Sequence, residues 1–185
     1  KQALNIKPNY AEVFSNMGNA LKDKGDLEAA IRSFKQAIAI NPGYAEAYSN
    51  IGNALKDKGD LEAAMDSYKR AIAINPHYAY GHYNMANALQ DRGNLEAAIE
   101  SYKKALKIKP DFVAAYINIG NLLLDKDDLE EAIKNYKKAI KINPDCAEAY
   151  HYMGIALRDK GELDAALKSY TQALKIKPDY AEAQF

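Results

Sequence analysis

Residues 45–78 read AEAYSNIGNALKDKGDLEAAMDSYKRAIAINPHY, and this stretch decides the fold. From Tyr48 to Leu55 the apolar and small residues recur at the spacing of one helical face, and the second half of the stretch repeats this pattern. The predicted core faces of the two helices are Tyr48, Ile51, Gly52 and Leu55, followed by Leu61, Met65, Tyr68 and Ile72. Between them, Gly59 suits the left-handed conformation that ends a helix, and Asp60 can cap the next helix. The stretch therefore predicts a helical hairpin.

The same hairpin recurs along the chain with a period of 34 residues. The period is marked by the prolines, which end each second helix: Pro8, Pro42, Pro76, Pro110, Pro144 and Pro178. A glycine of the first helix recurs as well, at Gly18, Gly52, Gly120 and Gly154. Two helices in a repeat of this length are typical of tetratricopeptide repeats, and the chain resembles that family over essentially its full length. The resemblance implies an all-α solenoid of helical hairpins wound into a right-handed superhelix.

The period also sets the expected repeat boundaries. Five complete repeats are expected, between the end of a preceding repeat and the start of a sixth, which indicates a piece of a longer array. The segments are 1–10 (end of a preceding repeat), 11–44, 45–78, 79–112, 113–146, 147–180 and 181–185 (start of a sixth repeat). The fourth repeat has Asp127 where the others have glycine, and aspartate tolerates the left-handed conformation well enough for the turn to form.

Composition limits the classes of partner. Lysine plus arginine and aspartate plus glutamate number 25 each, so no overall field attracts nucleic acid or an anionic membrane. No apolar run is long enough to span a bilayer. The single cysteine, Cys146, excludes an internal disulfide framework and suits a reducing compartment, so a cytoplasmic location is expected.

Two sets of asparagines lie on the face of the first helices that is turned away from the predicted core. The first asparagine set is Asn16, Asn50, Asn84 and Asn118, and the second is Asn19, Asn53, Asn87 and Asn121. Asparagine is a mediocre helix former, so its repetition needs a reason. An amide can hydrogen-bond the main chain of an extended peptide, and we expect this role for the first set. For the second set, bonding to a neighbouring helix is an equally good explanation.

The later repeats carry apolar and aromatic residues where the first two repeats carry polar ones. This later-repeat row consists of Tyr80, Tyr83, Ile117, Leu124, His151 and Tyr152. Such a row on one face is a candidate contact patch beside the asparagines, and packing against a neighbouring helix is the alternative. The expected peptide-binding surface comprises both asparagine sets and this row.

The resemblance refines the functional expectation. The asparagines are similar to those in the repeats of O-linked N-acetylglucosamine transferases and related bacterial and archaeal proteins, in which the first helices line a concave groove. The family's carboxylate clamp needs lysine or arginine on this face, and the corresponding positions hold residues such as Ser49, Tyr83 and Asn84. Binding of an acidic chaperone tail is therefore not expected.

No catalytic, cofactor or metal motif accompanies this surface. His77, His82 and His151 lack the spacing of metal ligands, and no phosphate-binding loop or nucleophile motif is present. The sequence thus predicts a noncatalytic module that binds a peptide or a partner helix. The alternatives are the substrate-recruiting part of a glycosyltransferase and a structural array. Weak end-to-end self-association is also expected. One apolar face, at Leu4 and Ile6, lacks a covering helix, and the apolar face of the fifth repeat is followed only by the short segment 181–185.

Overall fold

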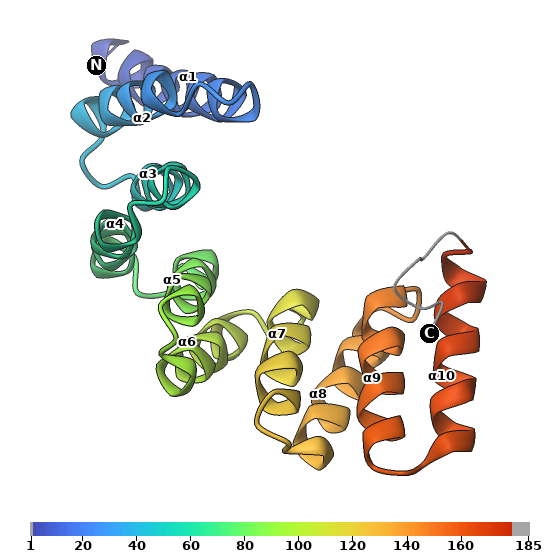
Figure 1. Cartoon of the computed structure of the whole chain (residues 1–185). Helices are drawn as coiled ribbons and strands as arrows, with labels where there is room; N and C mark the ends of the chain where they lie inside the picture. The colour runs from blue at the N-terminus through green and yellow to red at the C-terminus, as the bar shows by residue number, and fades with distance from the viewer. Residues whose placement is uncertain (1, 179–185) are drawn as a thin grey trace. The chain divides into compact units, whose positions relative to one another are not determined.

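The computed structural model describes the backbone of residues 2–178 and the side chains of residues 10–178 (Figure 1). In this part of the chain there are ten α-helices and no strands, which confirms the predicted all-α repeat fold. The helices are α1 (Gln2–Asp23), α2 (Leu27–Ile40), α3 (Ala45–Asp57), α4 (Leu61–Ile74), α5 (Ala79–Asp91), α6 (Leu95–Ile108), α7 (Val113–Leu124), α8 (Leu129–Ile142), α9 (Ala147–Asp159) and α10 (Leu163–Ile176). None of these helices is both long and apolar enough to cross a membrane.

The turns within the hairpins form as their residues predict. Gly59 has a φ of 86°, in the left-handed region that favours glycine, and it follows the end of α3. The side chain of Asp60 caps α4 by accepting a hydrogen bond from the backbone N–H of Ala63 at 3.2 Å. At the other end of α4, Asn75 is extended, because the residue before a proline is driven out of the helical region.

The turn of the fourth repeat forms without a glycine. Asp127 takes a φ of 61°, the only positive φ at a non-glycine residue in the described chain. The next residue, Asp128, caps α8 by accepting from the backbone N–H of Glu131 at 3.4 Å. The prediction that aspartate keeps this turn is therefore confirmed.

The first helix differs from the expectation for the N-terminal segment. Residues up to Pro8 were expected to end a preceding repeat, but α1 runs without a break from Gln2 to Asp23. Pro8 lies in the second turn of α1, where it has no N–H to donate to the carbonyl of residue 4. The side chains of Leu4 and Ile6 and the predicted start of a sixth repeat at 181–185 lie outside the described residues.

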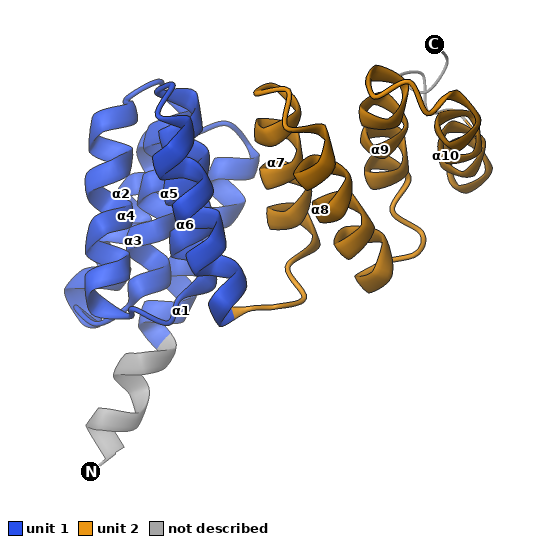
Figure 2. Cartoon of the chain, turned by 90° about the horizontal axis from the view of Figure 1, so that it is seen from below, with its two compact units in different colours: residues 1–108 blue, residues 109–185 orange. Residues whose placement is uncertain are grey.

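The chain divides into two compact units, residues 1–108 and 109–185 (Figure 2). In the first unit, each of the hairpins α1–α2, α3–α4 and α5–α6 packs against the next. The second unit contains the hairpins α7–α8 and α9–α10, which pack in the same way through α8 and α9. Within each unit, consecutive hairpins supply one another's core.

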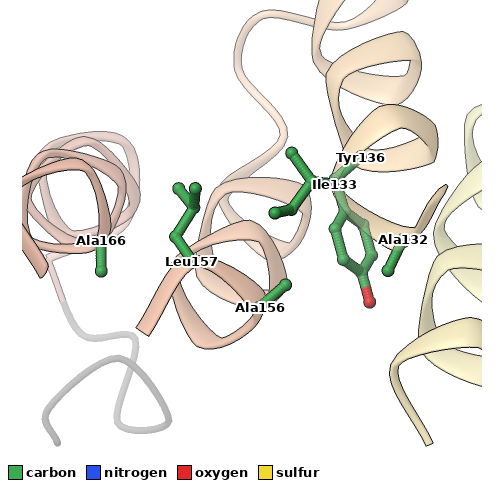
Figure 3. Packing of buried hydrophobic residues seen from close by; sticks show 6 residues of the cluster. All are labelled: Ala132, Ile133, Tyr136, Ala156, Leu157 and Ala166. Carbon is green, nitrogen blue, oxygen red and sulfur yellow. The ribbon is translucent and has the colours of Figure 1, made fainter. Parts of the chain in front are cut away.

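The core of each hairpin is built around one aromatic residue of its second helix. Tyr136 of α8 is fully buried, and its ring lies so close to Gly120 of α7 that a side chain there would overlap it. Around Tyr136, a cluster extends from α8 to α9 and α10 and contains Ala132, Ile133, Ala156, Leu157 and Ala166 (Figure 3). Tyr68 and Tyr102 are buried at the corresponding positions of α4 and α6. Small residues of the first helix thus create the space for a large ring.

Candidate functional site

The first helices of the first unit form a continuous surface, because α3 contacts both α1 and α5. Two polar contacts join α3 to α5. Near the middle of the helices, the Asn84 amide nitrogen donates to the Ser49 hydroxyl at 3.0 Å. Near their ends, the Lys56 ammonium lies 3.4 Å from the Asp91 carboxylate. These contacts hold the side chains of α3 and α5 in a defined arrangement.

The first asparagine set lies on this surface with differing exposure. Asn16 is exposed, whereas Asn50 and Asn84 are half-buried. The Nδ2 atom of Asn50 is buried and has no hydrogen-bond partner among the described residues. Such a donor costs free energy as long as it stays unpaired. In the second unit, Asn118 is half-buried on α7.

The second asparagine set bonds to the buried tyrosines. The hydroxyl of Tyr68 donates to Asn53 Oδ1 at 2.8 Å, and Tyr136 donates to Asn121 Oδ1 at the same distance. Asn87 accepts the hydroxyl of Tyr102 in the same way. The first repeat has Phe34 in place of the tyrosine, so the residue at the partner position of Asn19 has no hydroxyl. In three repeats these asparagines thus complete the hairpin core, in agreement with the structural alternative.

The position directly before each residue of the first asparagine set is buried in most repeats, contrary to the expectation that the later-repeat row forms a contact patch. Ser49 is completely buried, and Ile117 and His151 are only 3% and 7% exposed. For Ser49 and Ile117 the reason is the next first helix along each unit, whereas the ring of His151 lies against those of Tyr152 and Tyr170. Asn84 of α5 reaches Ser49, and Tyr152 of α9 packs into the cluster that contains Ile117. The prediction that Ile117 and His151 are accessible contact residues is therefore wrong.

The other members of the later-repeat row divide between packing and exposure. Tyr152 and Leu124 are half-buried and pack against the cluster around Tyr136. Tyr83 is also half-buried, with its ring centroid 5.5 Å from that of Tyr102. Tyr80 is different, because 47% of its surface is exposed. It is the member of the row that offers the most surface to a ligand.

The half-buried Tyr78 lies beside Tyr80. The ring centroids of Tyr78 and Tyr80 are 6.2 Å apart. Burial raises the pKa of Tyr78 to about 12, the negative charge of Glu46 adds to this effect, and a hydrogen bond with Ser49 opposes it. Tyr78 is thus hydrogen-bonded to the buried Ser49 while its ring lies near that of Tyr80.

A set of salt bridges between neighbouring repeats was not predicted. Each joins a basic residue after a first helix to a glutamate in the first turn of the preceding second helix. The pairs are Lys58–Glu28, Arg92–Glu62 and Lys160–Glu130. The bond from Lys58 holds the pKa of Glu28 below its usual value. The recurring separation of 30 residues between base and acid was the sequence signal that could have revealed them.

The described residues offer no site for a metal ion, because no three histidine, cysteine, aspartate or glutamate side chains among them are grouped as ligands. His82 is half-buried, and its Nε2 lies 3.0 Å from the carbonyl oxygen of Pro76.

Comparisons with known proteins agree with this geometry. A family model described as TPR repeat matches residues 18–59, 52–93, 86–127, 120–158 and 154–185. A crystal structure of MamA is 27% identical, with a TM-score of 0.77 over 89% of this chain and 96% of that chain. The structure of PilF from Pseudomonas aeruginosa has a TM-score of 0.87 at 18% identity, over 96% of this chain and 81% of that chain. At that identity, the likeness to PilF concerns the fold alone.

A third solved structure carries a title that mentions binding. YrrB, described as a TPR protein with an unusual peptide-binding site, is 22% identical, with a TM-score of 0.72 over 92% of this chain and 88% of that chain. This likeness also concerns the fold alone. No curated protein matches the sequence.

Proposed function

Since the chain belongs to the tetratricopeptide repeat family, we propose that it is a noncatalytic protein-interaction module whose first helices bind an extended peptide of a partner protein. The observation that carries this proposal is the exposure of Tyr80 on the surface shared by α3 and α5. Tyr80 lies one helical turn before Asn84, on the same face of α5. An apolar ring and an amide are thus presented together to a ligand.

The two kinds of side chain suit different parts of a peptide. The Tyr80 ring provides rigid apolar area with a polar tip, which suits a side chain of the ligand. The amides of Asn16 and Asn50 each combine a donor and an acceptor, which suits a peptide main chain of any sequence. The unpaired Nδ2 of Asn50 gains a partner if a small rotation of its side chain brings it to a ligand carbonyl. Recruitment of substrates to a glycosyltransferase remains a prediction from the resemblance of the asparagines.

Replacing Tyr80 by glutamate tests this site without introducing a residue foreign to the fold. Glutamate already occupies the equivalent positions Glu12, Glu46 and Glu148. We expect peptides selected from a phage-displayed library on the wild-type protein to bind the Tyr80→Glu variant roughly tenfold more weakly or worse, as for a tyrosine hot spot. Fluorescence anisotropy with labelled copies of the selected peptides measures the change.

An exposed position on a second helix provides the control. The Ala73→Glu variant adds the same negative charge to α4 in the same unit and should leave affinity unchanged. The proposal is wrong if the selected peptides bind Tyr80→Glu as tightly as they bind the wild-type protein.

End-to-end self-association is a second candidate function, and the exposure of apolar side chains on α1 and α10 favours it. Val13 and Met17 of α1 are 59% and 43% exposed, and Leu163 and Leu167 of α10 are 60% and 63% exposed. The equivalents of Met17 and Leu167 inside the repeats are buried, as Ile51, Met65 and Ile133 show with 5–7% exposure. These α1 and α10 faces therefore resemble the two halves of a repeat junction.

The junction between α4 and α5 shows how two such faces fit together. There, Met65 packs in one cluster with Met85. Leu167 is the equivalent of Met65, and Met17 is the equivalent of Met85. We propose that Leu167 of one copy packs near Met17 of a second copy. Because the two faces differ, the contact is heterologous and extends into a filament instead of closing into a dimer.

Complementary variants test this contact. In sedimentation over a wide range of concentrations, we expect the average mass of the wild-type protein to rise, and Met17→Glu and Leu167→Glu each to abolish the rise. In an equimolar mixture, the Met17→Glu variant keeps an intact α10 face and the Leu167→Glu variant keeps an intact α1 face. These two faces can still pair, so the mixture should form dimers and nothing larger. A wild-type mass that stays monomeric throughout would contradict the proposal.

A further inference from the structure

A positively charged hollow lies on the second unit, along a second helix. It has a volume of about 410 Å³ and runs along α8. Its lining residues are Glu130, Ile133, Lys134, Lys137, Lys138, Lys141 and Lys160. The four lysines of α8 follow the i, i+3, i+4, i+7 spacing of one helical face. We call this hollow the α8 lysine site.

Only one end of the α8 lysine site is neutralised. Lys134 pairs with Glu131 at 2.8 Å, and Lys160 bridges Glu130 and Glu162 at 3.4 and 2.9 Å. Toward the C-terminal end of α8, Lys137 and Lys141 have no ion pair with any described residue. Between them along the helix, the Lys138 ammonium lies 5.5 Å from the centre of the Tyr116 ring. Positive charge is therefore concentrated on the C-terminal half of α8.

The other second helices do not have this arrangement. At the position of Lys134, α4 has Asp66 and α6 has Glu100, and the ammonium of Lys103 pairs with Glu100 at 3.0 Å. The helix dipole favours a lysine in the last turn, which accounts for Lys141 but not for lysine at every position of the face. Because the whole chain has no net charge, the excess on α8 is a local feature.

We propose that the α8 lysine site binds a short acidic segment of a partner protein, with at least two carboxylates placed around one apolar side chain. The buried Ile133 and the lysine methylene groups provide an apolar floor, and the ammonium groups form its rim. Lysine is a flexible point charge that accepts carboxylates in varied positions. Glu130, Glu131 and Glu162 neutralise the lysines at the other end, so the excess positive charge covers only a short stretch, which fits a short peptide better than a nucleic acid strand.

A triple substitution with a matched control tests the proposal. The probe is a short fluorescein-labelled peptide in which one leucine is flanked on both sides by aspartates and glutamates. We expect its affinity to fall about tenfold in the Lys137→Gln/Lys138→Gln/Lys141→Gln variant, as for the loss of several exposed ion pairs. The control variant, Lys103→Gln/Lys104→Gln/Lys107→Gln, removes the same charge from the equivalent positions of α6 and should change affinity less than about twofold. Thermal melts confirm that both variants fold.

Two further measurements make the result decisive. Binding of the peptide should weaken with added salt, since the contacts are exposed charges. The proposal is overturned if the wild-type protein does not bind the peptide, if both triple variants lose affinity equally, or if labelled oligothymidylate binds as tightly as the peptide. Variants of Tyr80 should not affect this binding, so failure here is distinct from failure of the first-helix site.

Discussion

Replacing Gly120 by alanine is expected to destabilise the protein by about 2 kcal/mol, although alanine is the better helix former. A Cβ atom at Gly120 would overlap Tyr136 Cε1 and lie only 2.8 Å from Cζ and 2.9 Å from Cδ1. Tyr136 cannot move away easily, because it is fully buried and its hydroxyl is bonded to Asn121. The ring of Tyr152 is stacked near it, with a centroid separation of 6.2 Å. Chemical denaturation of the variant measures the effect.

The third repeat provides a natural counterpart to this substitution. There, Ala86 occupies the position of Gly120 and is buried opposite Tyr102. The Tyr102 hydroxyl lies within hydrogen-bond distance of Gln90 as well as Asn87, an arrangement that the second and fourth repeats lack. A Gly43→Ala variant is the control, since the nearest atom to its Cβ would be 3.4 Å away. If Gly120→Ala instead stabilises the protein, helix propensity outweighs the overlap and this account of the packing is wrong.

Replacing Asn53 by alanine is expected to cost about 1–2 kcal/mol, because it leaves the hydroxyl of Tyr68 without its acceptor. Burial raises the pKa of Tyr68 well above its usual value, which shows how poorly this hydroxyl is solvated. Removing both polar groups, in Asn53→Ala/Tyr68→Phe, should restore part of the loss. A double-mutant cycle measured by chemical denaturation gives the coupling between the two residues.

The first repeat supplies the matched control. Asn19 is the equivalent of Asn53, but Phe34 replaces the tyrosine and has no hydroxyl to satisfy. We therefore expect Asn19→Ala to change stability by no more than about 0.5 kcal/mol, in the stabilising direction given by helix propensity. Equal losses for Asn19→Ala and Asn53→Ala would show that the second asparagine set stabilises the hairpins in another way.

Much of the local structure could be predicted from the sequence, because its causes lie within a few residues of one another. Gly59 and Asp60 define the turn between α3 and α4 through their own backbone and side-chain preferences. Asn75 ends α4 because a proline follows it. Asp127 shows that even an exception to the repeat pattern could be anticipated from the residue alone. The second asparagine set was harder to interpret, because Phe34 and Ile155 interrupt the pairing of asparagine with tyrosine in the first and fifth repeats.

The sequence by itself determined the helices after α1, the turns and the repeat period, since each depends on the spacing of residues along the chain. Only the tertiary structure decided which side chains of the first helices remain accessible. Ser49 and Ile117 lie on the face turned away from their own hairpin, yet Asn84 and Tyr152 from the next first helix in each unit cover them. Tyr80, in contrast, stays exposed. Burial at these positions depends on residues about one repeat away, and helical periodicity carries no information about contacts at that distance.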